Sequence, residues 1–171
     1  MTESKKFNLN QDYCKSFPEA ISSGAEILIL GSMPGRSSLI TKEYYNHSRN
    51  IFWRIMSDII GFDNHKKAYS DKIEILKNRK IALWVVCQSC ERRDSLDSNI
   101  KKEEPNDIPG LISRHPTIRK IIFNGKKAEK IYDKYFNRNS EIKYLYLPST
   151  SPANTTMKLR EKVLKWRDSI D

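Results

Sequence analysis

Apolar residues in this chain gather into four short runs, which are separated by longer segments with a helical spacing of apolar positions. The runs are ILIL at residues 27–30, IALWVV at 81–86, IRKIIF at 118–123 and IKYLYL at 142–147. Short apolar runs are typical of buried strands, because a helix needs more residues to bury one face. The pattern therefore predicts four strands.

The segments between these runs predict helices. Ile51, Ile55 and Ile59 recur at every fourth position and Gly61 follows them, so residues 50–60 are expected to form a helix packed on a sheet. A further helix is expected over residues 70–80, and another that starts at a cap, Asn106 or Asp107, and ends at residue 114. A third is expected from Gly125 to residue 136. The last is expected at the end of the chain, where Leu159, Val163, Trp166 and Ile170 form an apolar stripe. Lys158, Lys162 and Lys165 are expected to form a basic stripe on that last helix.

Three segments are less regular. Residues 1–10 are polar, carry no targeting signature and are expected to fray. Residues 11–22 are expected to hold a short helix. Residues 91–107 contain two Asp-Ser pairs and a proline, so we expect a long surface connection with a helical turn.

Strands that alternate with helices indicate an α/β fold with a mostly parallel sheet, and 171 residues suit a single domain. The carboxyl ends of parallel strands share one edge of the sheet, where ligands bind in such folds. The loops that leave the predicted strands cover residues 31–35, 87–90, 124–125 and 148–154. All are rich in Gly, Pro, Ser, Asn or Cys, so a binding site is expected at this edge.

The charge balance indicates a polyanionic partner. Lys and Arg number 31 against 21 Asp and Glu, which gives a formal net charge of +10 and a pI near 9.5. Neutralising phosphates releases counterions and so gives affinity for nucleic acid; a general lysine-rich bias is the alternative explanation. Three cysteines without a secretory segment favour a reducing cytoplasm, and no apolar run approaches the length of a membrane span.

Several familiar chemistries lack their motifs. The loop GSMPGRSS at residues 31–38 matches neither GxxxxGK[ST] nor GxGxxG, and the chain has no GxSxG. The three histidines have no zinc-ligand spacing, so no metal site is expected. Cys87 and Cys90 form a CxxC pair, which fits a redox pair or half a metal site; packing at a strand end is the favoured interpretation.

Five segments, in this order, resemble the uracil-DNA glycosylase superfamily, and specifically its hypoxanthine-DNA (deoxyinosine) glycosylase branch. They are LILGSMPGRSSL, YYNHSRNIFW, ALWVVCQSCERRDSLDSNI, FNGKKAE and LPSTSPAN, and they lie between residues 27 and 154. The resemblance implies a single three-layer α/β/α domain with a central four-stranded parallel sheet. It also implies a monofunctional base-excision-repair enzyme that hydrolyses the N-glycosidic bond of hypoxanthine, with uracil and xanthine as further candidates. The expected partner is DNA containing deaminated bases, and the expected protein is a cytoplasmic monomer without a cofactor, associated with the nucleoid during repair.

The resemblance also assigns the catalytic residue. In many relatives the first motif, here residues 31–35, contains an Asp or Asn that positions the attacking water, but this chain has Ser32 and Met33 there. The hypoxanthine branch lacks that residue too and relies on a later Asn, which corresponds to Asn50. Bond cleavage by dissociation needs a placed water, which an amide carbonyl can orient. The alternative role for Asn50 is the N-cap of the helix that follows.

The implied base pocket consists of Gly31, Ser32, Met33, Pro34, Gly35, Tyr45 and Asn124. A flipped base needs a stacking surface, which Tyr45 matches by resemblance; packing is the alternative for Tyr44 and Tyr45, and we expect one of the two to pack. The amide of Asn124 suits a base edge, with capping of the next helix as its rival role.

The expected DNA-binding residues are His47, Ser149, Thr150, Ser151, Asn154, Lys158 and Arg160. Hydroxyls, backbone N–H groups and a helix start suit phosphate binding. The alternative for His47 is a structural role in the fold. The run Pro-Ser-Thr-Ser-Pro at residues 148–152 is also explained by a turn, and Lys158 and Arg160 by a solvated helix face.

The chain also departs from the family pattern. The branch often has Pro after the histidine and Asp after the tryptophan of the second strand, where this chain has Ser48 and Val85; Leu147 stands where some relatives have His. No large apolar residue in the last motif is suited to fill the gap left by a flipped base. A non-catalytic nucleic-acid-binding module and an α/β protein that binds a phosphate ligand with the GSMPGRSS loop remain the alternative functions.

Overall fold

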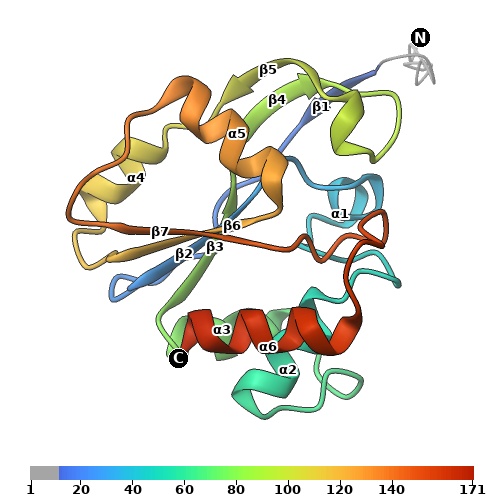
Figure 1. Cartoon of the computed structure of the whole chain (residues 1–171), viewed down its shortest axis with the longest axis vertical. Coiled ribbons are helices and arrows are strands. Elements are labelled where there is room, and N and C mark those ends of the chain that lie inside the picture. The colour runs from blue at the N-terminus through green and yellow to red at the C-terminus, as the bar shows by residue number, and fades with distance from the viewer. Residues whose placement is uncertain (1–11) are drawn as a thin grey trace, which may run out of the picture.

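A four-stranded parallel sheet forms the centre of the protein. The computed structural model describes residues 12–171, and its main sheet has the order β3-β2-β6-β7 (Figure 1). The strands are β2 Ile27–Gly31, β3 Ile81–Val85, β6 Lys120–Asn124 and β7 Lys143–Leu147, and all neighbouring pairs are parallel. The four predicted strands are confirmed to within two residues at each end.

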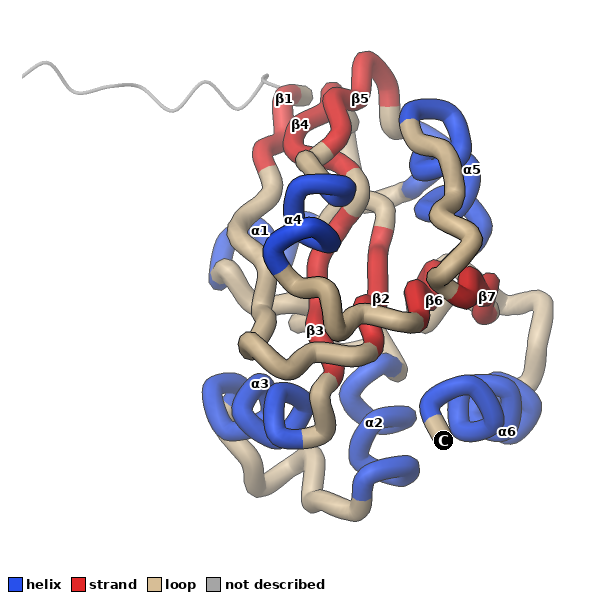
Figure 2. The backbone as a smooth tube through the Cα atoms, turned by 90° about the vertical axis from the view of Figure 1, so that its left-hand side faces the viewer, coloured by secondary structure: helices blue, strands red, loops and turns tan. Residues whose placement is uncertain are grey.

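Helices cover both faces of this sheet, which confirms the three-layer α/β/α prediction. One layer contains α2 Phe52–Ile60, α3 Tyr69–Asn78 and α6 Leu159–Ile170; the other contains α4 Ile108–Arg114 and α5 Lys126–Tyr135 (Figures 1 and 2). Asp107 caps α4 by accepting a hydrogen bond from Gly110 N at 3.0 Å, which decides between the two predicted caps. A short helix, α1 Arg36–Thr41, follows β2 and was not predicted.

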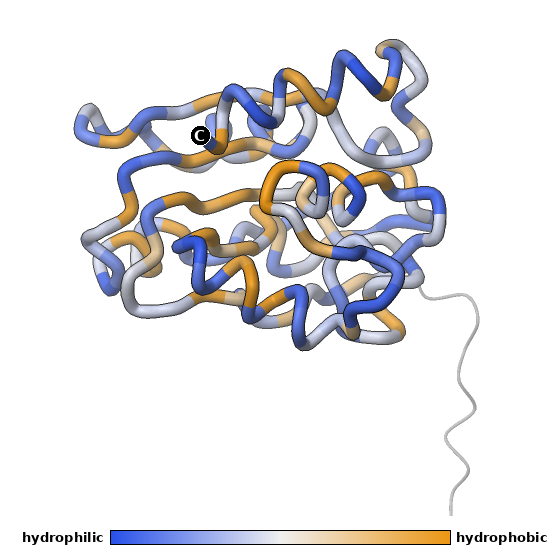
Figure 3. The backbone as a smooth tube through the Cα atoms, turned by 90° about the horizontal axis from the view of Figure 1, so that it is seen from below, coloured by the Kyte–Doolittle hydropathy of each residue, from blue (hydrophilic) through white to orange (hydrophobic). Residues whose placement is uncertain are grey.

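Burial explains why the strands were readable in the sequence. All five residues of β3 and four of the five in each of β2 and β6 are buried, because helices pack on both faces of these strands. Strand β7 lies at the edge of the sheet and is more exposed. Figure 3 shows the resulting apolar interior between the more hydrophilic outer helix faces.

A second, antiparallel sheet corrects two of the sequence predictions. It has the order β1-β4-β5 and consists of β1 Tyr13–Lys15, β4 Cys87–Glu91 and β5 Lys101–Pro105. The helix expected over residues 11–22 is therefore wrong for residues 12–22, because β1 pairs with the distant β4. The helical turn expected in the segment 91–107 is present as η1 Asp97–Asn99, but the segment is not merely a surface connection, since it also contains β5.

The CxxC segment belongs to this second sheet. Cys87 and Cys90 lie in β4 rather than in a loop, so the predicted loop 87–90 is wrong. Both side chains are buried, and burial raises the pKa of the Cys87 thiol to about 12 and that of Cys90 to about 11. Redox CxxC pairs have acidic thiols, so these values support the packing role. All three cysteines of the chain are free.

No helix within residues 12–171 is long and apolar enough to cross a membrane. The predicted frayed start, residues 1–10, lies outside the described residues.

Candidate active site

The carboxyl edge of the main sheet carries a pocket of about 210 Å³. Strand register brings Gly31 beside Val85 and Asn124 beside Leu147, so loops from all four strands start at the same edge. The pocket is lined by residues from six segments of the chain: 32–38, 44–50, Val85, 95–97, Asn124, and 149–153. It lies at the edge where the sequence predicts a polar site, and residues 95–97 take the place of the loop expected at 87–90.

The first motif forms one wall of the pocket. Ser32, Met33, Pro34 and Gly35 line it, whereas Gly31 ends β2 just behind the wall. A Cβ atom at Gly31 would lie 3.3 Å from the Tyr45 hydroxyl, so this position leaves little room for a larger residue.

Arg92 holds this loop from behind. Arg92 is 3% exposed, and its guanidinium donates to Pro34 O at 2.6 Å and to Met33 O at 3.4 Å. The amide N–H of Arg36 donates to the Ser95 hydroxyl at 2.9 Å, which adds a second link between the loop and the segment that follows β4. The first motif is therefore positioned by a segment that lies about sixty residues further along the chain.

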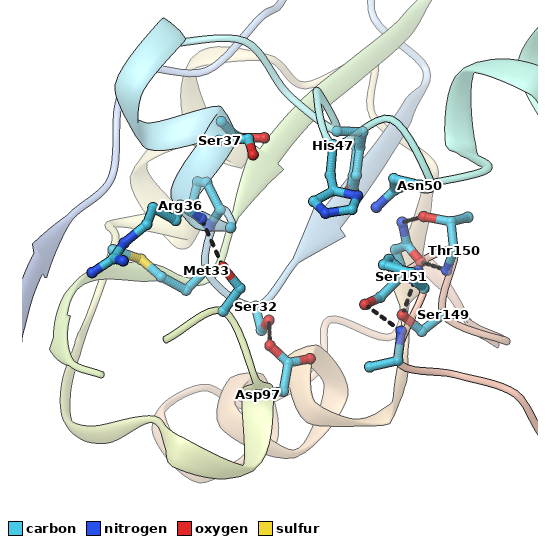
Figure 4. A pocket seen from close by; sticks show the side chains of 18 of the residues that line it. Ser32, Met33, Arg36, Ser37, His47, Asn50, Asp97, Ser149, Thr150 and Ser151 are labelled. Carbon is cyan, nitrogen blue, oxygen red and sulfur yellow. Dashed lines mark hydrogen bonds between the residues drawn. The ribbon is translucent and has the colours of Figure 1, made fainter. Parts of the chain in front are cut away.

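Among the residues 12–171 that line the pocket, Asp97 contributes the one carboxyl group. The Ser32 hydroxyl donates to Asp97 Oδ1 at 2.5 Å, and Ser32 is 6% exposed (Figure 4). Burial raises the pKa of the Asp97 carboxyl above its ordinary value, while the Ser32 hydrogen bond and the charges of Arg92 and Lys127 oppose that shift. An acidic group is thus held against Ser32 of the first motif.

Asn50 lines the opposite side of the pocket (Figure 4). Its Oδ1 accepts the Phe52 N–H at 3.0 Å, the first N–H of α2, and the neighbouring Ile51 N–H donates to Thr150 O at 3.1 Å. The N-cap of α2 is Ile51, so the N-cap role that was the alternative for Asn50 is wrong. Asn50 nevertheless binds the first N–H of the helix from one position earlier, and it also faces the pocket. Figure 4 shows its amide nitrogen directed into the open space.

The two tyrosines have different environments. Tyr44 is 2% exposed and its hydroxyl donates to Pro18 O at 2.8 Å, so Tyr44 is the packing residue of the pair. Tyr45 lines the pocket, and its ring stacks on Phe52 with centroids 4.1 Å apart. Its hydroxyl is buried and has no hydrogen-bond partner in the described chain. Tyr45 adopts the left-handed backbone conformation, with φ of 58°, which is uncommon for a residue other than glycine.

Asn124 is clamped by Thr150. Asn124 Nδ2 donates to the Thr150 hydroxyl at 3.0 Å, and Asn124 Oδ1 accepts the Thr150 N–H at 3.0 Å. Both residues are buried, with exposed fractions of 6% and 1%. The amide thus fixes the loop after β7, and α5 receives no side-chain cap from it.

The loop after β7 is held by further internal bonds. Lys162 Nζ donates to Asn154 O at 2.7 Å and to Ser149 O at 3.3 Å, and Asn154 Nδ2 donates to Ser149 O at 3.2 Å. Lys162 is only 4% exposed, so its predicted place in an exposed basic stripe is wrong; burial lowers its pKa. Ser149 and Ser151 line the pocket with Thr150, whereas Asn154 lies behind them.

The predicted cationic residues separate into different regions. His47 is exposed at the rim of the pocket. Lys158 and Arg160 are exposed but do not line it; Arg160 lies in another groove with Arg54 and Arg167. A basic groove that shares Arg36 with the pocket contains Lys15, Lys42 and Arg93.

Sequence reasoning missed Asp97, Arg92 and Ser95 as site residues. The available signal was the segment 91–99, ERRDSLDSN, in which both Asp-Ser pairs occur. The polar composition of this segment predicts a surface connection, and its hydrogen bonds to the first motif are too long-range for a local sequence pattern to indicate. Among residues 12–171 no group of three or more His, Cys, Asp or Glu side chains is arranged to hold a metal ion.

Comparison with known proteins agrees with this architecture. The profile of the Uracil DNA glycosylase superfamily matches residues 18–169. A protein named hypoxanthine DNA glycosylase from Methanosarcina acetivorans is 39% identical over 140 residues, which cover 82% of this chain and 87% of the relative. A protein of the same name from Methanosarcina barkeri is 41% identical over 114 residues, which cover 67% of this chain and 72% of the relative.

A solved structure shares the fold. The solution NMR structure of a putative uracil DNA glycosylase from Methanosarcina acetivorans superimposes with a TM-score of 0.81 at 35% identity, covering 92% of this chain and 96% of the other. The match includes the strand ends that build the pocket, since it extends over almost the whole of both chains. This chain belongs to the uracil DNA glycosylase superfamily.

Proposed function

We propose that this protein is a DNA glycosylase that removes hypoxanthine, with uracil and xanthine as further substrates, from DNA in base excision repair. The observation that carries the proposal is the pocket at the carboxyl edge of the sheet, which combines an aromatic floor at Tyr45, the first-motif loop and Asn50. Relatives named hypoxanthine DNA glycosylase align over most of the chain.

The lining residues support a reaction without a covalent intermediate. A bifunctional glycosylase uses an amine nucleophile to form a Schiff base with the sugar. No lysine is found among the residues 12–171 that line this pocket, and Arg36 is too basic to act as a neutral amine. Water is therefore the nucleophile in this proposal, and the enzyme requires no cofactor.

Asn50 positions that water. When the glycosidic bond dissociates, the sugar becomes cationic before attack, so the water needs placement more than deprotonation. The Asn50 amide is held by Phe52 N–H through Oδ1, which leaves Nδ2 and the second Oδ1 lone pair for the water. The departing base becomes anionic, and the backbone N–H groups of the loop 32–35 are the donors available to it.

DNA lies across the pocket mouth in this proposal. The hydroxyls of Ser149 and Ser151, with exposed His47, are suited to a phosphate on one side. The basic groove with Lys15, Arg36 and Lys42 is suited to the strand on the other side. The protein acts as a monomer in the cytoplasm in this proposal.

The test is formation of abasic sites. The protein is incubated with oligonucleotides that carry one hypoxanthine, uracil or xanthine, either single-stranded or opposite each base, and abasic sites are then cleaved with alkali. Product from hypoxanthine is expected, and cleavage without alkali would contradict the monofunctional reaction. Binding to these oligonucleotides without product from any of them would make the protein a non-catalytic nucleic-acid-binding module.

A further inference from the structure

The Asp97 carboxylate has no role in the reaction outlined above, yet it lies inside the pocket. Ser32 holds Oδ1, whereas Oδ2 accepts no hydrogen bond from residues 12–171 and is directed away from Ser32, toward the side of the pocket that carries Ser149 (Figure 4). Within the same residues, no Lys, Arg or His nitrogen lies within salt-bridge distance of it. This oxygen is therefore available to accept a hydrogen bond from a ligand that enters the pocket.

Its position favours a base over a sugar or phosphate as the source of that donor. Asn50 and residues 149–151, which are suited to the water and the phosphate, lie on the other side of the pocket from Asp97 and Ser32 (Figure 4). A nucleotide held by its phosphate at residues 149–151 would extend its base toward Asp97. A phosphate beside Asp97 would also be repelled by the carboxylate.

Base chemistry supplies a matching donor. A flipped base is read by hydrogen bonds to its Watson–Crick edge. Adenine N1 and cytosine N3 are acceptors, and deamination turns these into the N1–H of hypoxanthine and the N3–H of uracil; xanthine also carries N1–H. An ionised carboxylate is acceptor-only, so it pairs with the deaminated form and repels the lone pair of the parent base. Guanine and thymine carry the same N–H, so this contact separates hypoxanthine from adenine but not from guanine.

We propose that Asp97, oriented by Ser32, is the specificity residue that accepts the ring N–H of a deaminated base in this pocket. The inference rests on the proposed function and adds the group that reads the base. Val85, which replaces the Asp often found after the tryptophan of the second strand, leaves that wall apolar, so within residues 12–171 Asp97 is the one lining carboxyl group able to do this. A carboxylate would oppose the negative charge on the departing base, so its role is recognition and not stabilisation of the leaving group.

The experiment measures binding without chemistry. Oligonucleotides carry a single 2′-fluoroarabino nucleoside, which resists hydrolysis, with either hypoxanthine or unsubstituted purine as its base; purine N1 is an acceptor. Affinities are measured by fluorescence anisotropy for the wild type and for Asp97→Asn, Ser32→Ala and Asp94→Asn. Asp94 is the matched control because it lies in the same segment and loses the same charge, and within residues 12–171 it bonds only to Leu96 N and Asn99 Nδ2. It borders the basic groove and not the pocket, so its loss should change the affinity for both bases alike.

The wild type is expected to prefer hypoxanthine over purine. Asp97→Asn should reduce this preference by roughly 10- to 100-fold, the range for a hydrogen bond to a charged group. Ser32→Ala should reduce it less, because it releases the carboxylate without removing it, and Asp94→Asn should retain it. Retained preference in Asp97→Asn, equal loss in Asp94→Asn, or no preference in the wild type would each overturn the assignment. Abasic-site formation tests the proposed function separately, since the wild type can cleave hypoxanthine even if Asp97 does not read it.

Discussion

Replacing Asn50 separates its two structural roles, at the start of α2 and in the pocket. Asn50→Ala removes both the Oδ1 that accepts the Phe52 N–H and the amide that faces the pocket. Asn50→Ser removes the amide but keeps a hydroxyl oxygen, which can accept a nearby helix N–H. Both variants should lose turnover, and only Asn50→Ala should lose stability.

The magnitudes make the two roles distinguishable. Loss of a capping hydrogen bond costs about 1 kcal/mol, which lowers Tm by roughly 2–4 °C for a protein of this size. If the protein is stable by about 5 kcal/mol or more, well over 99% of Asn50→Ala molecules remain folded. Misplacing the water, by contrast, should lower kcat by about 100-fold. Unfolding therefore cannot account for a loss of activity of that size.

The assay is single-turnover cleavage of a hypoxanthine oligonucleotide, combined with thermal denaturation and with binding to an uncleavable analogue. The expected result is a rate about 100-fold lower in both variants, with wild-type affinity for DNA. Wild-type turnover in Asn50→Ser would refute the reasoning, because it would leave Asn50 with the helix-start role alone.

Three further predictions concern the loop after β7, the Asp97 carboxyl and Arg36. Gly125 has φ of 98°, and an added Cβ would lie 3.0 Å from Ser149 Cβ. Gly125→Ala should therefore lower the free energy of unfolding by about 1–3 kcal/mol and displace the loop after β7. Gly24→Ala should do neither, because an added Cβ there meets no atom within 4 Å; denaturant unfolding measures both variants, and equal stability would contradict the strain argument. Burial raises the pKa of the Asp97 carboxyl, which faces Ser32, Arg92 and Lys127, so the folded protein binds this proton more tightly than the unfolded chain does. The stability of the protein should therefore fall as pH rises from the ordinary carboxyl pKa through the raised one. Asp97→Asn should therefore raise Tm at neutral pH and abolish that part of the pH dependence, and an unchanged Tm would argue against the burial penalty. Arg36→Gln should weaken binding to all single strands alike and reduce the slope of log K against log salt by about 0.7, as measured by anisotropy titrations at several salt concentrations; an unchanged slope would place the DNA elsewhere.

The main sheet was predictable because its strands are buried on both faces. All five residues of β3 are buried, so the sequence IALWVV is a continuous apolar run without competing periodicity. The helices followed from the spacing of residues such as Ile55 and Trp166, both fully buried in the structure. The position of the site at the carboxyl edge then followed from the topology of parallel sheets.

The second sheet was not predictable in the same way. Strand β5, KKEEP, has no apolar alternation, and β1 contains only three residues. Both exist because they pair with β4, and that pairing joins residues about 75 positions apart in the case of Cys14 and Cys90. Local propensity contains no information about such a partner.

The sequence alone determined the main sheet, its helices and the polar loops at one edge, and the resemblance of its motifs identified Tyr45 and Asn50 for a pocket. Tertiary structure decided how those loops are held and what else enters the pocket. It assigned Asn124 to a clamp on Thr150, placed Lys162 inside the fold, and brought Asp97 to Ser32 across 65 positions. The physical reason is range: periodicity and turn chemistry act between neighbours in the chain, whereas a buried hydrogen bond can be recognised only after the fold has brought its partners together.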